Sequence, residues 1–175
     1  MLGHRTAFLM LPIGHGRVYC YCDGMSASGD QAGDGLGRFF SGFAEPVLGL
    51  LGSVPDQELL HRSTIEEVEL DSWANGRVVL VGDAAHATSP NMAEGAGMAL
   101  EDALVLADCL QRRETVPAAL SDFETRRRPR TDWVLAQTHR RDRTRYLPTA
   151  ARNVVLRASG RRIFRSHYQP LCEPV

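Results

Sequence analysis

The residues best suited to chemistry lie in one 28-residue window, residues 76–103. An apolar run, Arg77–Val81, ends in Gly82-Asp83, and a loop then leads to two glycines, Gly95 and Gly97. Ligands of open α/β sheets bind beyond the carboxyl ends of strands, and a helix N-terminus presents unpaired N–H groups with partial positive charge. Glycines lacking Cβ let a flat ligand approach closely, although close packing of the helix on a sheet is the simpler explanation of the pair.

Two strands and a helix must position this window. The continuous apolar run at 77–81 is typical of a strand buried on both faces. Before it, Thr64–Leu70 alternates polar and apolar residues, which predicts another strand, and Trp73–Gly76 is expected to form the tight turn between them. After the loop, apolar residues spaced three or four apart predict a helix from about Met92 to Leu110.

The N-terminal part predicts a hairpin followed by a helix. Arg5–Ile13 and Arg17–Cys22 are rich in strand-forming residues and are joined by a Gly-His-Gly turn, so we expect an antiparallel pair. Residues 23–37 are rich in glycine and predict a loop. Apolar residues then recur at helical spacing over Leu36–Leu51, with Pro46 splitting the segment.

The C-terminal part is helical in pattern beyond Arg112. The expected interruptions are three prolines, Pro117, Pro129 and Pro148. Ala150–Phe164 predicts a further amphipathic helix, and we expect the tail Gln169–Val175 to be loose.

The composition is that of a folded globular protein, with 175 residues of which 43% are hydrophobic and 23% charged. This length suits one ordinary domain with an appendage. The 4 cysteines form no dense framework, which favours a reducing compartment. No apolar run approaches the ~20 residues of a membrane span, and no signal peptide is recognised, so we expect a cytoplasmic protein without membrane contact.

The charge is unevenly distributed along the chain. Residues 1–111 hold 5 Arg and 15 acidic residues, whereas residues 112–175 hold 15 Arg and 6 acidic residues. Docking of the Arg-rich helices on the acidic part of the same chain is the favoured explanation. Nucleic acid binding is disfavoured, because Pro129, Asp132 and Asp142 interrupt a continuous basic face.

Taken together, the window resembles the C-terminal FAD signature of the class A flavoprotein monooxygenases, the p-hydroxybenzoate hydroxylase-like family. The matching residues are Gly82-Asp83-Ala84-Ala85-His86, Pro90, Gly95-Ala96-Gly97 and Glu101-Asp102-Ala103. A lone Gly-Asp or Gly-x-Gly would be a weak signal, whereas this ordered set is specific. Less specific likenesses in the flanks extend the resemblance over most of the chain.

The resemblance implies an α/β fold, here as an α+β fragment. It would comprise the C-terminal part of a FAD-binding Rossmann-like domain, part of a substrate-domain β-sheet and a C-terminal helical segment. Residues 1–62 would belong to the substrate domain, residues 63–111 would form the returning part of the FAD-binding domain, and residues 112–175 would be the Arg-rich helices.

The family's roles carry over to particular positions. The resemblance implies that Asp83 accepts hydrogen bonds from the ribityl hydroxyls of FAD, and that Pro90 lines the flavin ring near its reacting edge. Backbone N–H groups at the helix start would face the N1–C2=O edge of the flavin. No residue is assigned as catalytic with certainty. The implied cofactor-binding residues are Gly82, Asp83, Ala84, Pro90, Gly95, Ala96 and Gly97.

Other polar residues of the window favour structural roles. His86 is expected to orient the loop by hydrogen bonding, in preference to acting as a base. Glu101 and Asp102 are expected to hold the helix to the Arg-rich segment. An Asp83–His86 metal pair is disfavoured, since no third or fourth ligand is at hand, and no metal is expected.

The activity implied by the resemblance is hydroxylation of an aromatic or similar small molecule. FAD would be the cofactor, NAD(P)H would reduce it, and O2 would supply the transferred oxygen atom. Tyr19 and Tyr21 on one face of the second strand, or Phe8 and Met10 on the first, are candidates to face the substrate, and a structural aromatic role is equally compatible.

The family's N-terminal GxGxxG motif is absent from this sequence. The expectation is therefore a C-terminal half, and a separate N-terminal FAD-binding half is a candidate partner. Two alternatives stay open beside the monooxygenase. The chain could be a non-catalytic remnant or half of a split flavoenzyme, or it could come from another FAD oxidoreductase such as a halogenase or a reductase.

Overall fold

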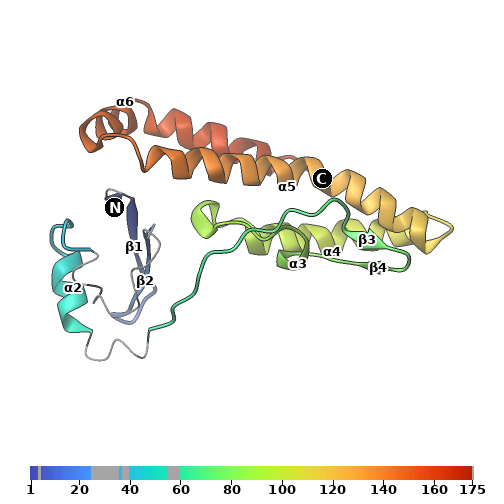
Figure 1. Cartoon of the computed structure of the whole chain (residues 1–175), viewed down its shortest axis with the longest axis horizontal. Helices are drawn as coiled ribbons and strands as arrows, with labels where there is room; N and C mark the ends of the chain where they lie inside the picture. The colour runs from blue at the N-terminus through green and yellow to red at the C-terminus, as the bar shows by residue number, and fades with distance from the viewer. Residues whose placement is uncertain (4, 25–35, 37–39, 55–59, 175) are drawn as a thin grey trace. The chain divides into compact units, whose positions relative to one another are not determined.

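The structure is a computed structural model that describes residues 1–3, 5–24, 36, 40–54 and 60–174. These residues fall into two compact units. Unit 1 comprises Met1–Arg62 and Thr144–Val155, and unit 2 comprises Ser63–Arg143 and Leu156–Val175. Both units mix helices with small sheets, and the elements are labelled in Figure 1. Within the described ranges, every helix is too short or too polar to cross a membrane.

Unit 1 is built on the predicted hairpin. Strand β1 (Thr6–Pro12) pairs antiparallel with β2 (Val18–Gly24), in a register that places Thr6 opposite Gly24 and Pro12 opposite Val18. The turn uses positive φ angles at Gly14 (82°) and Gly16 (68°), a conformation that glycine adopts without steric penalty. The Gly-His-Gly signal therefore predicted the hairpin correctly.

The core of unit 1 lies against one face of this hairpin. Phe8 packs edge-on against Phe40, with ring centroids 5.5 Å apart, and both side chains are buried with Val47. Helix α2 (Val47–Ser53) begins directly after Pro46. The split predicted at Pro46 is present, since α2 begins directly after it, but residues 40–46 form turns and not a helix. A proline ring is incompatible with a helical turn directly before it.

The predicted loop at residues 23–37 lies mostly outside the described residues, which leave out 25–35 and 37–39. Asp23 and Gly24 belong to β2.

The strand predicted at 64–70 is not present in unit 2. Val68 N donates to Ala87 O at 2.9 Å, and Arg128 donates to the carbonyl oxygens of Leu70 and Asp71, each at 2.8 Å. These contacts give partners to three backbone groups at the end of the segment, and no neighbouring strand lies beside it among the described residues. The alternating pattern does not mark a buried face, because Ile65 and Leu70 are 42% and 36% exposed, and a strand also needs a ladder of partners.

The buried strand predicted at 77–81 is also only partly present. Strands β3 (Ala74–Asn75) and β4 (Val78–Val79) form a two-residue ladder around the predicted turn. Val78 is 68% exposed, and Leu80 and Val81 are 39% and 42% exposed, so the run is not buried on both faces. The described part of the chain provides no further strand beside β4 that could cover these side chains.

Short turns connect β4 to the long helices of unit 2. Helix α3 (Asp83–His86) is followed by the 3₁₀ turn η2 (Pro90–Met92) and then by α4 (Gly95–Arg112). The predicted helix start at Met92 is therefore three residues early. A single turn of 3₁₀ helix with proline at its first position separates the two elements.

The Arg-rich part forms two long helices, α5 (Val116–Thr144) and α6 (Thr149–Tyr168). Pro148 separates them as predicted, but α5 continues through Pro129. Contacts on both sides hold the helix there, since Arg127 is bound to α4 and Arg128 to the backbone of Leu70 and Asp71. These contacts outweigh the one backbone donor that proline removes.

The tail is more ordered than predicted. Residues Gln169–Cys172 form the 3₁₀ turn η3, and the Arg130 guanidinium donates to the carbonyl oxygens of Leu171 and Glu173.

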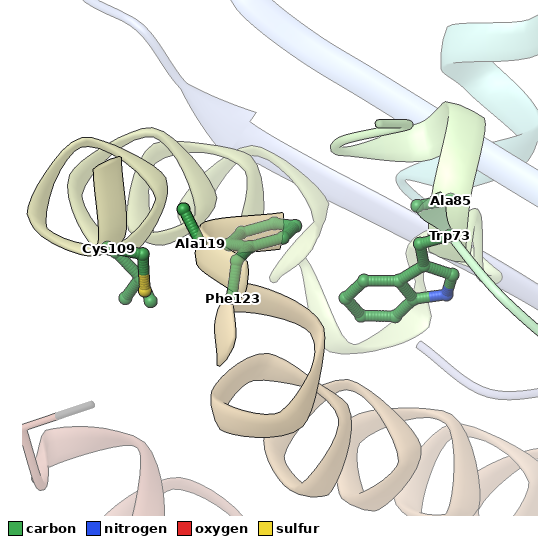
Figure 2. Close-up of a cluster of buried hydrophobic side chains, with 6 residues drawn as sticks. Trp73, Ala85, Cys109, Ala119 and Phe123 are labelled. Atoms are coloured by element: carbon green, nitrogen blue, oxygen red, sulfur yellow. The ribbon is translucent and has the colours of Figure 1, made fainter. Parts of the chain in front are cut away.

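Figure 2 shows the core of unit 2. Phe123 and Ala119 of α5 pack beside Cys109 of α4, and the cluster continues through Trp73 and Ala85. The rings of Trp73 and Phe123 lie 6.0 Å apart between centroids. Burial of this cluster joins α5 to α4 and to the segment that precedes β4, and so supports the loop that carries the predicted site.

Candidate functional site

The turn at Gly82 directs the chain from β4 into the site. Gly82 has φ 58° and ψ −140°, is buried, and is followed at once by α3. A Cβ at this position would lie 3.2 Å from Cβ of Ala99, so the turn is packed closely on α4. Both the positive φ and the close approach require glycine. The glycine at position 82 is therefore structural, whereas the packing explanation offered for Gly95 and Gly97 is not tested by this contact.

Asp83 lies beside the start of α4. Its side chain is exposed, and its Oδ1 would be 3.7 Å from a Cβ placed on Gly95. The first N–H groups of an α-helix have no acceptor inside the helix, and they carry the positive end of the helix dipole. The structure thus brings an exposed carboxylate and a row of N–H donors to one edge of the molecule.

The remaining predicted residues line the same stretch of backbone. Ala84, Pro90, Ala96 and Gly97 are exposed, and the turn before α4 passes through Ala93 with φ 58°. A cofactor could therefore reach this surface without displacing side chains at Gly95 or Gly97.

Glu94 also borders this surface, and the sequence analysis missed it. Its Oε2 would be 3.6 Å from a Cβ on Gly97, so its side chain lies over the first turn of α4. Burial and the nearby charge of Glu101 raise the pKa of Glu94, against the opposing effect of Arg130. An acidic residue directly before the Gly-x-Gly pair was the available signal.

A buried carboxylate, Asp102, holds the turn from below. Its Oδ2 accepts hydrogen bonds from Gly82 N and from His86 Nε2, each at 2.8 Å. Its Oδ1 accepts from Arg127 Nε at 2.7 Å. Burial raises the pKa of Asp102, but the hydrogen bonds from His86, Gly82 and Arg127 outweigh this effect and leave the pKa below its ordinary value.

Arg127 joins α5 to the same helix. Its side chain is fully buried, and it donates to Glu101 Oε2 at 2.6 Å and to Met98 O at 3.1 Å in addition to Asp102. The expectation that Glu101 and Asp102 hold the helix to the Arg-rich segment agrees with these contacts. Arg126 repeats the arrangement nearer the surface, where it donates to Asp108 at 2.6 Å. Docking of arginines on acidic residues of the same chain is thus observed within unit 2.

His86 contributes to the turn and not to the exposed surface. Its ring packs against Trp73 at 5.1 Å between centroids, and its Nε2 is bonded to Asp102. Its Nδ1 is buried and has no hydrogen-bond partner among the described residues. This is the geometry expected of a residue that orients the loop.

A cleft of about 610 Å³ lies on another part of unit 2. It is bordered by Trp73, His86 and Arg128, together with α5 residues such as Asp132 and His139. None of the predicted cofactor-binding residues lines it.

The two predicted substrate-facing tyrosines lie in unit 1. Tyr19 is 50% exposed, whereas Tyr21 is half-buried and donates its hydroxyl to Asp23 Oδ2 at 2.8 Å. Asp23 is in turn paired with Arg145. Burial and the hydrogen bond to Asp23 raise the pKa of Tyr21, so its hydroxyl is held as a structural donor. On the opposite face of the hairpin, Phe8 is buried and Met10 is packed against the core, which leaves them structural in unit 1.

Comparison with known proteins gives a consistent picture. Residues 54–138 match the family described as FAD binding domain. The aurachin C monooxygenase/isomerase of Stigmatella aurantiaca is 34% identical over 142 residues, which are 79% of this chain and 37% of that protein. The FAD-dependent urate hydroxylase of Klebsiella pneumoniae is 34% identical over 150 residues, or 82% of this chain and 39% of that protein.

A solved structure has a similar fold. The crystal structure of Klebsiella pneumoniae HpxO complexed with FAD and uric acid matches 95% of this chain and 45% of its own, with a TM-score of 0.78 and 26% identity. The α/β class, with long C-terminal helices, is thereby confirmed. The chain spans less than half of the length of the relatives it matches.

Proposed function

This chain belongs to the class A FAD-dependent monooxygenases, and on that premise we propose that it supplies the part of such an enzyme that holds the flavin ring and ribityl chain of FAD. The observation that carries the proposal is the position of the exposed Asp83 carboxylate against the first turn of α4. A carboxylate accepts hydrogen bonds from sugar-like hydroxyls, and helix N–H groups donate to a carbonyl edge that gains negative charge.

The described residues fit FAD in two respects. The donor set combines acceptor oxygens at Asp83 with N–H donors at Gly95, Ala96 and Gly97, and so complements hydroxyls on one side and the N1–C2=O edge on the other. Gly95 and Gly97 carry no side chains of their own, so a planar ring that approaches the helix start would meet only the Asp83 and Glu94 carboxylates beside it. The exposed Ala84 and Pro90 would complete the contact surface, and the buried Gly82 would serve the site by forming the turn before Asp83.

When bound, FAD supplies the redox chemistry by which NAD(P)H and O2 are used to hydroxylate a small molecule. This chain's own contribution would be binding, orientation and the favourable charge of the helix terminus. The aromatic class of the substrate and the dependence on NAD(P)H are part of the proposal, and the relatives named for monooxygenase and hydroxylase activity support it. Tyr19 is the better placed of the two tyrosines for a ligand contact, because the hydroxyl of Tyr21 is bound to Asp23.

A separate polypeptide segment that carries GxGxxG is proposed as the partner. One face of α4 is apolar and exposed, with Leu100 at 69% and Leu104 at 73%, and Val78 of β4 is exposed as well. In a doubly wound sheet such a strand and helix are covered by a neighbouring strand–helix unit, and the ligand lies at the edge between them. The greater length of the relatives, of which this chain covers 37–39%, supports such an occupant.

The test is a titration of the purified chain with FAD, followed by flavin fluorescence. We expect weak but saturable binding that Asp83→Ala reduces by about tenfold, as the loss of a charged hydrogen-bond acceptor implies. Asp132→Ala, which removes another exposed carboxylate of unit 2, is the matched control and should bind as the parent does.

Adding the part of the Klebsiella pneumoniae urate hydroxylase that this chain does not match should tighten FAD binding, and Leu104→Glu should prevent that gain. Equal affinity of the parent and Asp83→Ala would contradict the role of Asp83. Absence of FAD binding by the folded chain, with and without the added segment, would refute the proposed function.

A further inference from the structure

Helix α3, which begins with Asp83, is held at both ends by one oxygen atom. Gly82, directly before Asp83, donates its N–H to Asp102 Oδ2, and His86, the last residue of α3, bonds to the same oxygen through Nε2. Asp102 itself is fully buried on α4. The exposed Asp83 carboxylate therefore stands on a four-residue element whose two ends are fixed from the helix whose N-terminus it faces.

We propose that Asp102 is a positioning residue for flavin binding, which sets the direction of the Asp83 carboxylate by holding Gly82 and His86. The inference rests on the proposed function for the role of Asp83. Asp102 is fully buried, so it would act on the exposed surface through the turn alone.

Only an ionised carboxylate meets all the donors around this position. One oxygen receives two donors from the turn, and the other receives Arg127 Nε at 2.7 Å. The amide of asparagine has one oxygen and one NH2 group. Its NH2 would therefore face either the Arg127 Nε–H or the Gly82 N–H, both of which are donors. A glutamate keeps the charge but displaces its oxygens by one methylene, so it cannot keep the present geometry of the bonds to Gly82 N and His86 Nε2.

Asp108 provides a matched control on the same helix. It also accepts hydrogen bonds from two arginines, Arg112 and Arg126, each at 2.6 Å, and it has no contact with the turn at Gly82. Asp108→Asn therefore removes a charged acceptor from the α4–α5 contact without altering the support of Asp83.

The experiment measures FAD affinity and resistance to urea in parallel for Asp102→Asn, Asp102→Glu and Asp108→Asn, in the full chain. We expect Asp102→Asn to weaken FAD binding by about tenfold and Asp108→Asn to leave it within about twofold. Asp102→Glu should recover much of the resistance to urea, because Arg127 is paired again, but not the FAD affinity. A role in stability alone predicts that affinity and stability recover together, and that result would overturn the proposal.

A second measurement does not depend on flavin. Hydrogen exchange of the Gly82 amide, followed by NMR in the absence of FAD, should be at least about tenfold faster in Asp102→Glu than in the parent, with the amide of Val134 on α5 unchanged. Unchanged exchange at Gly82 would overturn the proposal, even if Asp102→Asn proves unable to fold. If the parent fails to bind FAD while this exchange difference is seen, the proposed function fails and the hold of Asp102 on the turn stands.

Discussion

Replacement of Arg127 by methionine tests whether the buried ion pair holds unit 2 together. Arg127 is fully buried and donates to Asp102, Glu101 and Met98 O at 2.7, 2.6 and 3.1 Å. Methionine fills a similar volume but leaves the fully buried Asp102 carboxylate without its cationic partner. Removing one member of a buried pair typically costs about 3–5 kcal/mol, because the remaining charge is uncompensated. We expect Arg127→Met to lower the free energy of unfolding of unit 2 by that amount at pH 7.

The loss of stability in Arg127→Met should depend on pH in a defined direction. The folded pKa of Asp102 lies below its ordinary value of about 3.9, so its contribution is present above about pH 4 and is lost as the pH falls through the folded pKa. In Arg127→Met this pKa rises, because one of the hydrogen bonds that lower it is removed. The difference in stability between parent and variant should therefore be largest near neutral pH and should shrink toward pH 4.

Urea unfolding followed by tryptophan fluorescence is the appropriate assay. Both tryptophans, Trp73 and Trp133, lie in unit 2, so the signal reports on this unit. Arg126→Met is the matched control. Arg126, the neighbour of Arg127, is 32% exposed and pairs with the partly exposed Asp108, and exposed ion pairs contribute far less to stability than buried ones. Equal destabilisation by the two substitutions at pH 7 would refute the reasoning.

Two further predictions concern packing and the hairpin. Phe123→Ala removes a fully buried ring beside Trp73 and should destabilise unit 2 by about 3–5 kcal/mol in urea unfolding. Phe164→Ala, at a ring that is 62% exposed, should have little effect on the free energy of unfolding. Similar losses of stability in the two variants would contradict the assigned core. Burial and the bond to Asp23 raise the pKa of Tyr21, so ultraviolet titration should show one of the 4 tyrosines ionising later than the rest, and Tyr21→Phe should remove this late step. Since the unfolded phenol ionises near pH 10 and the folded one does not, stability should fall above about pH 10; a single common titration step would argue against the contact.

Local signals predicted the parts of the fold that local interactions determine. The Gly-His-Gly turn predicted the β1–β2 hairpin, because positive φ angles at the two glycines set its geometry. The Gly82-Asp83 and Gly95-x-Gly97 pattern marked the turn and the first turn of α4, which lie together in the structure, although the predicted helix start at Met92 was three residues early. The acidic pair Glu101-Asp102 was correctly expected to bind the Arg-rich segment, since buried charges require partners.

Features that depend on distant residues could not be predicted in this way. The continuation of α5 through Pro129 follows from contacts of Arg127 and Arg128 with other elements. The alternating pattern at 64–70 indicated a strand, but the formation of a ladder depends on a neighbouring strand that the pattern does not specify. The position of Glu94 over Gly97 depends on how the turn at Ala93 presents the helix start.

The discontinuity of unit 1 has a consequence for synthesis of the chain on the ribosome. Arg152 donates to Leu2 O and Gly3 O, each at 2.7 Å, from 150 and 149 residues further along the sequence. Arg145 likewise pairs with Asp23 of β2. At translation rates of about 5–20 residues per second, the N-terminal strand is made roughly 7–30 s before these arginines exist. The hairpin must therefore wait in an incomplete state, with the carbonyl groups of Leu2 and Gly3 lacking these donors, until the first turn of α6 has been made.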